Sequence, residues 1–197
     1  HTLRLTAFSR GEVVGQVFAP MIYLDGRLRP GWPKHFEVAG DYPTNDWRDV
    51  KVADLDADGR AEIIAVVAGS AAGQPTRLVV MDPDGPVRWT RNLGHFEPYH
   101  DLPVVGDLDG DGALEVIADA GEERLIHAFH ADGSTVAGLW PVEVEAGTLG
   151  KVLADLDGDG RLELIAYANE AGADRRHLYV FDAAGNRIRH WILGQCE

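Results

Sequence analysis

Three copies of one nine-residue pattern hold the residues of this chain that are best suited to chemistry. In each copy, acids occupy positions 1, 3, 5 and 9, and glycine occupies position 6. The acids are Asp54, Asp56, Asp58 and Glu62 in the first copy, Asp107, Asp109, Asp111 and Glu115 in the second, and Asp155, Asp157, Asp159 and Glu163 in the third. Acids at alternate positions of a curled loop aim their oxygens at one point, and calcium takes six to eight oxygen ligands. The pattern therefore predicts three calcium sites.

The glycine of each copy favours a metal loop as well. Glycine adopts positive φ easily, so it allows the sharp turn that brings the carbonyl of position 7 round as another ligand. A plain polar turn is the alternative interpretation of a single copy, because Asp and Gly are common in turns. Three copies that keep all four acids and the glycine favour calcium. Without metal, the four carboxylates would repel one another, so we expect a metal-free loop to be strained or mobile.

The loops are predicted to join strands, not helices. An EF-hand needs a bidentate Glu at position 12 and a helix on each side, and here position 12 is Ala65, Ala118 or Ala166. The flanking segments are short, apolar and rich in β-branched residues, which is typical of strands. They are residues 51–53, 104–106 and 152–154 before the loops, and residues 63–67, 116–118 and 164–167 after them.

The loops belong to a repeat of about 50 residues. In each repeat a β-like run ends in a turn with glycine, and a strand with Trp32, Trp89, Trp140 or Trp191 follows. No long segment has a helical period. Repeated four-stranded units of this length predict an all-β chain of β-propeller blades, with antiparallel strands, each packed on its neighbours. We expect one domain over residues 1–197, with blades at about residues 1–38, 47–93, 103–144 and 150–193, the last three with calcium loops. The first blade is expected to have strands at residues 2–8, 12–18, 20–24 and 27–32.

With its three Asp-x-Asp-x-Asp-Gly-x-x-Glu loops between strands, the chain resembles the FG-GAP/VCBS repeat family over about residues 20–194. That family includes the calcium-binding blades of integrin α-subunit propellers and many secreted bacterial proteins. The segments Gly31-Trp32-Pro33 and Leu139-Trp140-Pro141 are similar to its bacterial branch. The resemblance implies that the acids given above are the calcium ligands, and that position 7 adds the carbonyls of Arg60, Ala113 and Arg161. Members more often close seven or eight blades. A chain with about four is therefore expected to be a fragment of such a ring, half of a ring that a homodimer completes, or a small four-bladed ring.

Composition excludes some partners. The net charge is -14 and no basic stripe is present, so we expect no nucleic-acid partner. No apolar run approaches the roughly 18 residues of a membrane helix, so no membrane insertion is expected. Cys196 is the single cysteine, which excludes an internal disulfide. The sequence begins at His1 and shows no signal peptide, so we interpret it as a mature or excerpted piece of a longer product.

The aromatic and histidine residues allow two interpretations. The repeated tryptophans suit a sugar-stacking platform, but one large aromatic at the same point of each blade favours packing between blades. Trp47 lies outside the repeat and is the better candidate for an exposed contact. His127 and His130 are expected on opposite faces of a strand, whereas His95 and His100 flank a loop that could bring them together. We favour surface or rim positions for all eight histidines.

These observations predict a binding module and not an enzyme. The sequence has no Gly-x-Ser-x-Gly elbow and no P-loop, and calcium in a filled cage is structural. We expect a calcium-stabilised adhesion module, secreted or at the cell surface, that recognises a protein or a glycan. Extracellular calcium modules bind at about 10⁻⁴–10⁻³ M and fill only where calcium is plentiful, which favours that location. The alternatives are the propeller part of a secreted polysaccharide-active enzyme, a propeller appended to a secreted hydrolase, and a scaffold that spaces other domains.

Overall fold

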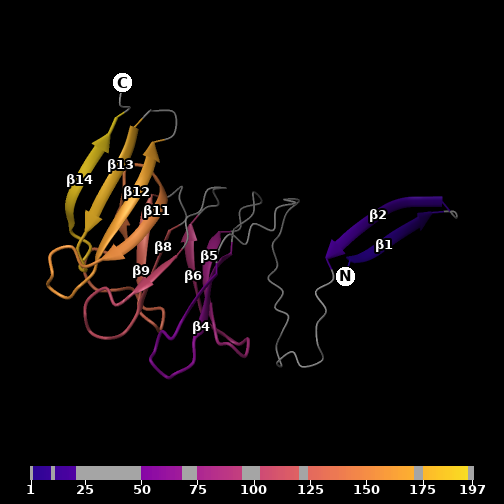
Figure 1. Cartoon of the computed structure of the whole chain (residues 1–197), viewed down its shortest axis with the longest axis horizontal. Coiled ribbons are helices and arrows are strands. Elements are labelled where there is room, and N and C mark those ends of the chain that lie inside the picture. The colour runs from indigo at the N-terminus through magenta and orange to yellow at the C-terminus, as the bar shows by residue number, and fades with distance from the viewer. Residues whose placement is uncertain are drawn as a thin grey trace. The chain divides into compact units, whose positions relative to one another are not determined.

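The computed structural model describes residues 2–9, 12–20, 50–67, 75–94, 103–119, 124–170 and 175–194, with backbone alone before residue 50. Every regular element in these ranges is a β-strand. The chain divides into two compact units, His1–Lys34 and His35–Glu197. The first unit contains an antiparallel hairpin of β1 (Thr2–Ser9) and β2 (Glu12–Pro20), drawn in indigo in Figure 1. These are the first two strands predicted for the first blade, and the strand predicted at 27–32 lies outside the described residues.

The described residues of the second unit form three antiparallel sheets of four strands each (Figure 1). The β3–β6 sheet consists of β3 (Val50–Ala53), β4 (Glu62–Val67), β5 (Thr76–Met81) and β6 (Val87–Gly94). The β7–β10 sheet consists of β7 (Val104–Gly106), β8 (Glu115–Asp119), β9 (Leu125–Phe129) and β10 (Val142–Glu143). The β11–β14 sheet consists of β11 (Gly147–Ala154), β12 (Glu163–Glu170), β13 (Arg175–Phe181) and β14 (Arg187–Leu193). The predicted all-β class and the repeated four-stranded antiparallel unit are confirmed for these three sheets.

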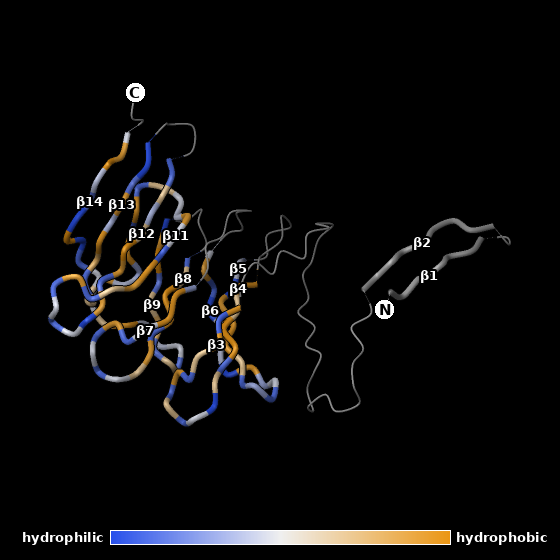
Figure 2. Tube along the Cα trace, viewed as in Figure 1, coloured by the Kyte–Doolittle hydropathy of each residue, from blue (hydrophilic) through white to orange (hydrophobic). Residues whose placement is uncertain are grey.

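Both faces of the middle sheet are covered. Successive side chains of a strand point to opposite faces. In β8, Val116 and Ala118 therefore belong to a core cluster with the β3–β6 sheet, while Ile117 belongs to a second cluster with the β11–β14 sheet. All five residues of β8 are buried, and Figure 2 shows β8 as mainly hydrophobic. Burial on both faces explains the continuous apolar run of this strand.

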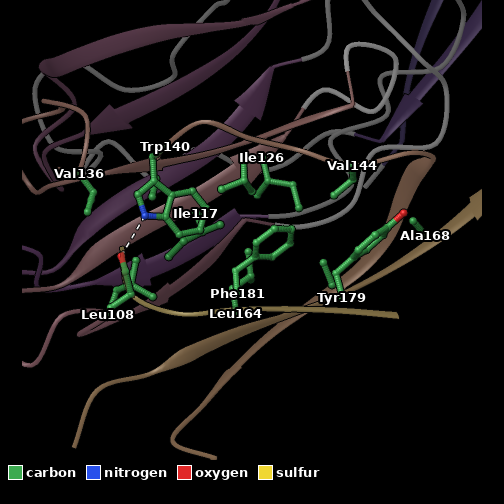
Figure 3. Close-up of a cluster of buried hydrophobic side chains, with 14 of the residues drawn as sticks. Leu108, Ile117, Ile126, Val136, Trp140, Val144, Leu164, Ala168, Tyr179 and Phe181 are labelled. Atoms are coloured by element: carbon green, nitrogen blue, oxygen red, sulfur yellow. Dashed lines mark hydrogen bonds between the residues drawn. The ribbon is translucent and has the colours of Figure 1, made fainter. Parts of the chain in front are cut away.

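Two of the repeated tryptophans join neighbouring sheets. The indole Nε1 of Trp89 donates to the carbonyl of Ala131 at 2.7 Å, and that of Trp140 donates to the carbonyl of Ala183 at 3.0 Å (Figure 3). Trp89 and Trp140 are 8% and 7% exposed, so their predicted packing between neighbouring four-stranded sheets is confirmed. Trp191 is 46% exposed, so the same prediction is wrong for that residue. Trp32 and Trp47 lie outside the described residues.

Trp140 also departs from its predicted strand. It lies in a bend before the two-residue strand β10 and precedes Pro141. Proline has no N–H to donate to a strand ladder, which explains why the strand does not begin earlier. Gly138 in the same bend has φ 116°, and a Cβ there would lie 2.3 Å from the carbonyl oxygen of Ala184. This close approach of the bend to the next sheet requires glycine.

Within the described ranges, no helix has the length and hydrophobicity that a membrane crossing requires.

Candidate metal loops

Each acidic loop folds around its own side chains. The glutamate of position 9 accepts the backbone N–H of position 2, and the aspartate of position 1 accepts the N–H of the glycine at position 6. The glutamate contacts are Leu55 N to Glu62 Oε2 at 2.9 Å, Leu108 N to Glu115 Oε2 at 2.8 Å, and Leu156 N to Glu163 Oε2 at 2.7 Å. The glycine contacts are Gly59 N to Asp54 Oδ2 at 2.9 Å, Gly112 N to Asp107 Oδ2 at 3.0 Å, and Gly160 N to Asp155 Oδ2 at 3.1 Å. The same local structure therefore recurs in all three loops.

The acids of position 5 fix the backbone of position 7. Their carboxylates accept the N–H groups of Arg60, Ala113 and Arg161, the three residues whose carbonyls complete the predicted ligand sets. The distances are 2.7 Å from Arg60 N to Asp58 Oδ1, 2.7 Å from Ala113 N to Asp111 Oδ1, and 2.8 Å from Arg161 N to Asp159 Oδ1. Position 7 is thus held beside the acids in every loop.

Left-handed backbone occurs at two positions of each loop. The glycines of position 6 have φ 85°, 92° and 88° at Gly59, Gly112 and Gly160, as the predicted sharp turn requires. Position 4 is also left-handed, at Gly110 (φ 76°), Gly158 (φ 82°) and, without glycine, Ala57 (φ 57°). The second turn was missed from the sequence, although glycine at position 4 in two copies is its signal.

Carboxylates converge in the second and third loops. Asp107, Asp109 and Glu115 place ligand oxygens within 4.8 Å of one another, and so do Asp155, Asp157 and Glu163. Asp111 and Asp159 lie outside these groups and serve the backbone contacts described above. In the first loop, Asp54, Asp56 and Asp58 come together but Glu62 does not join them.

The second loop has the chemistry of a hard-cation site. All its side-chain ligands are oxygens, as calcium prefers. The buried Oδ1 of Asp107 has no hydrogen-bond partner, which leaves a carboxylate oxygen for a cation. Burial raises the pKa of Glu115, although the Leu108 N–H and His130, whose Nδ1 lies 3.2 Å from Glu115 Oε1, lower it in part. A buried carboxylate of this kind is stabilised by a positive charge placed against it, so the residues present fit calcium.

In the first loop, the side chain of Arg88 lies among the acidic residues. Arg88 of β6 donates from Nη1 to Asp56 Oδ2 at 2.7 Å and from Nε to Asp82. Its Nη2 lies 3.1 Å from Glu62 Oε1, as an ion pair without hydrogen-bond geometry, and 3.8 Å from Asp58 Oδ2. The sequence pattern gave no sign of this contact.

A histidine cluster lies apart from the loops. His177 Nδ1 is 3.0 Å from His190 Nε2, and a Glu145 oxygen lies within 4.8 Å of both rings' nitrogens. His177 is 4% exposed, which corrects the expectation that every histidine is at the surface or rim. Burial would raise the pKa of Glu145, but hydrogen bonds from Tyr179 and Arg187 outweigh it and lower the pKa to about 2. The carboxylate is therefore already engaged. His95 and His100 lie outside the described residues.

A pocket of about 460 Å³ that is open to solvent lies beside the first strands of the three sheets. Residues of β3, β7 and β11 line it, together with Leu114. The walls are mostly aliphatic, with Lys51 and Lys151 as the charged residues. Lys151 lies within 2.6 Å of Asp119 Oδ1, and both side chains are buried, at 0% and 2% exposure.

The chain is similar to known proteins in structure, not in sequence. No protein-family model matches the chain, and no curated protein matches it. The crystal structure of the V. cholerae biofilm matrix protein Bap1 is similar to this chain, with 18% sequence identity and a TM-score of 0.37. The match covers 74% of this chain and 28% of that chain, so this chain spans less than a third of the Bap1 structure.

Proposed function

We propose that this chain is a calcium-stabilised binding module made of β-propeller blades of the FG-GAP/VCBS kind, secreted or displayed at the cell surface. The observation that carries the proposal is the convergence of two aspartates and a buried glutamate in the second and third loops. When bound, calcium supplies positive charge to these acids. Because each loop joins the first two strands of its sheet, that charge fixes one strand to the next. The partner is a protein or a glycan, recognised on the loops or on a face of the sheets.

Calcium removal is the direct test of this proposal. At a free concentration of 10 to 100 times its Kd, one bound ion stabilises the folded state by about 1.4–2.7 kcal/mol. A chelator should therefore lower the Tm of the chain, and about 10 mM calcium should restore it. Magnesium at equal concentration should restore little, because it dehydrates reluctantly and demands a stricter octahedral shell. A Tm that does not respond to calcium would contradict the proposal.

Single substitutions locate the ions. Glu163→Gln keeps an oxygen that accepts the Leu156 N–H but removes the charge of the carboxylate. We expect the number of calcium ions, counted by native mass spectrometry, to fall by one in this variant. Glu143→Gln removes the same charge from an exposed strand residue and should leave the count unchanged.

Binding and catalysis are separated by one panel of polysaccharides and extracellular proteins. We expect the chain to bind a target from this panel without changing it chemically, and to release it when a chelator removes calcium. If the chain degrades a polysaccharide, and a substitution outside the loops abolishes that activity, the result would favour an enzyme.

The same proposal includes a homodimer that covers the free face of the β11–β14 sheet. Leu55 and Leu108, at position 2 of the first two loops, are 1% and 0% exposed, because a neighbouring sheet lies over each. Leu156 holds that position in the third loop and is 57% exposed. Leu93 of β6 is 1% exposed, whereas Leu193, at the matching place in β14, is 44% exposed. The third sheet thus presents the surface that in its neighbours is an interface.

Charged substitutions on this face should break the dimer. Trp191→Asp and Leu193→Asp are each expected to raise the dimer's Kd at least tenfold, a loss of about 1.4 kcal/mol, because each places a charge where a large apolar side chain of β14 is 46% or 44% exposed on this face. Val87→Asp is the matched control, since Val87 is 47% exposed, close to Trp191, and lies in the β3–β6 sheet. Sedimentation equilibrium in calcium measures the effect. A monomer at all concentrations would contradict the dimer and leave the calcium proposal intact.

A further inference from the structure

The three loops have the same acids, but their sheets differ in the residue that follows the turn between the third and the fourth strand. Across the turn that precedes this strand, Met81 pairs with Val87 and Phe181 pairs with Arg187. Arg88 and Ile188, the next residues, therefore hold matching positions in their sheets. In the middle sheet, the bridge between Phe129 and Thr135 gives that position to Val136. Arg88 thus contacts the acids of its own loop, whereas the residues at the matching positions of the other two sheets are aliphatic. In the second loop, His130 lies against Glu115 instead.

Arg88 is seated where a loop cation would lie. Its guanidinium reaches three acids of the predicted ligand set, namely Asp56, Asp58 and Glu62. Asp82, in the turn before β6, accepts from its Nε and holds it there. A planar guanidinium with several donors suits this arrangement of carboxylates better than a lysine ammonium would.

The acids of the first loop are arranged differently from those of the other two loops. In the second and third loops the buried glutamate of position 9 joins two aspartates, whereas in the first loop the group is Asp54, Asp56 and Asp58. Glu62 is fully buried like Glu115, yet its Oε1 faces Arg88 and not the aspartate group. A metal ion bound to Asp56 and Glu62 would lie within a few ångströms of the guanidinium, and two cations so close repel each other.

We propose that Arg88 takes the place of calcium in the first loop, so that the chain binds two calcium ions, in the second and third loops, and not three. This inference rests on the proposed calcium function of those two loops. The first loop is then closed by an internal ion pair network at any calcium concentration, and only the other two loops respond to the ion. Calcium thus controls the β7–β10 and β11–β14 sheets but not the β3–β6 sheet.

The exchange of Arg88 and Ile188 tests the inference. Native mass spectrometry and titration calorimetry in saturating calcium should count two ions in the natural chain, three in Arg88→Ile and one in Ile188→Arg. The doubly exchanged chain should bind two again. Ile188 is 40% exposed, so an arginine there is accommodated, and Asp182 stands before β14 as Asp82 does before β6. Arg88→Lys keeps the positive charge and should stay at two.

Each result has a distinct meaning. Three ions in the natural chain would overturn the role of Arg88 and leave the calcium function standing, since the guanidinium would then move aside. Two ions in Arg88→Ile would also overturn it, because the first loop would fail to bind for another reason. No ions in any chain would refute the calcium function itself. Arg88→Ile is also tested by Tm, in case it does not fold in chelator. If its first loop binds calcium, added calcium should raise the Tm of Arg88→Ile more than the Tm of Ile188→Arg.

Discussion

Trp140→Ala is expected to lower the free energy of unfolding by about 3–5 kcal/mol, the usual cost of removing a large buried aromatic side chain. Trp140 is 7% exposed and lies in the cluster that joins the β7–β10 and β11–β14 sheets (Figure 3). Its loss leaves a cavity between two sheets and takes away the donor to the Ala183 carbonyl. Urea denaturation at fixed calcium, followed by circular dichroism, measures the change.

Trp191→Ala is the matched control for that experiment. Trp191 is 46% exposed, and substitutions at exposed sites usually change stability by no more than about 0.5 kcal/mol. The comparison is made at concentrations where the chain is monomeric, so that a dimer does not contribute. Trp140→Phe keeps most of the packing and should lose roughly 1 kcal/mol with the hydrogen bond. Equal losses for Trp140→Ala and Trp191→Ala would refute the joining role of Trp140.

The different fates of these tryptophans show where sequence reasoning stops. The strands next to the loops were predictable, because short apolar runs bounded by Asp and Gly are local signals. The predicted residues 63–67 and 116–118 fall within β4 and β8. Burial of a tryptophan is not a local property, since it depends on whether another sheet lies against the same face. Trp140 and Trp191 follow similar turns, yet only Trp140 has such a neighbour among the described residues.

In the candidate site, too, the sequence predicts the local contacts but not the contacts between distant residues. The spacing of acids and glycine predicted the loops, because all their backbone contacts fall within nine residues. Arg88 reaches Asp56 from 32 residues away, through the pairing of β3 to β6 across the sheet. His177 and His190 meet because the register of β13 and β14 pairs Tyr179 with His190. Register of this kind depends on the turn and on the neighbouring sheet, so residue spacing alone did not reveal either contact.

Lys151→Met is expected to lower the free energy of unfolding by about 3–5 kcal/mol, as when one partner of a buried ion pair is removed. Lys151 on β11 and Asp119 at the end of β8 belong to different sheets, and their side chains are 0% and 2% exposed. The variant removes the ammonium that faces a buried carboxylate. Thermal and urea denaturation in calcium measure the loss.

A double variant shows whether this ion pair adds to the free energy of unfolding. Replacing both partners of a buried pair by apolar residues is often neutral or stabilising, because two desolvated charges disappear together. We therefore expect Lys151→Met combined with Asp119→Leu to recover most of the stability that Lys151→Met loses. Recovery would show that the charge pair adds no net stability beyond what apolar packing between the two sheets supplies. If the double variant is as unstable as the single one, the ion pair itself stabilises the contact between the β7–β10 and β11–β14 sheets, and apolar packing does not replace it.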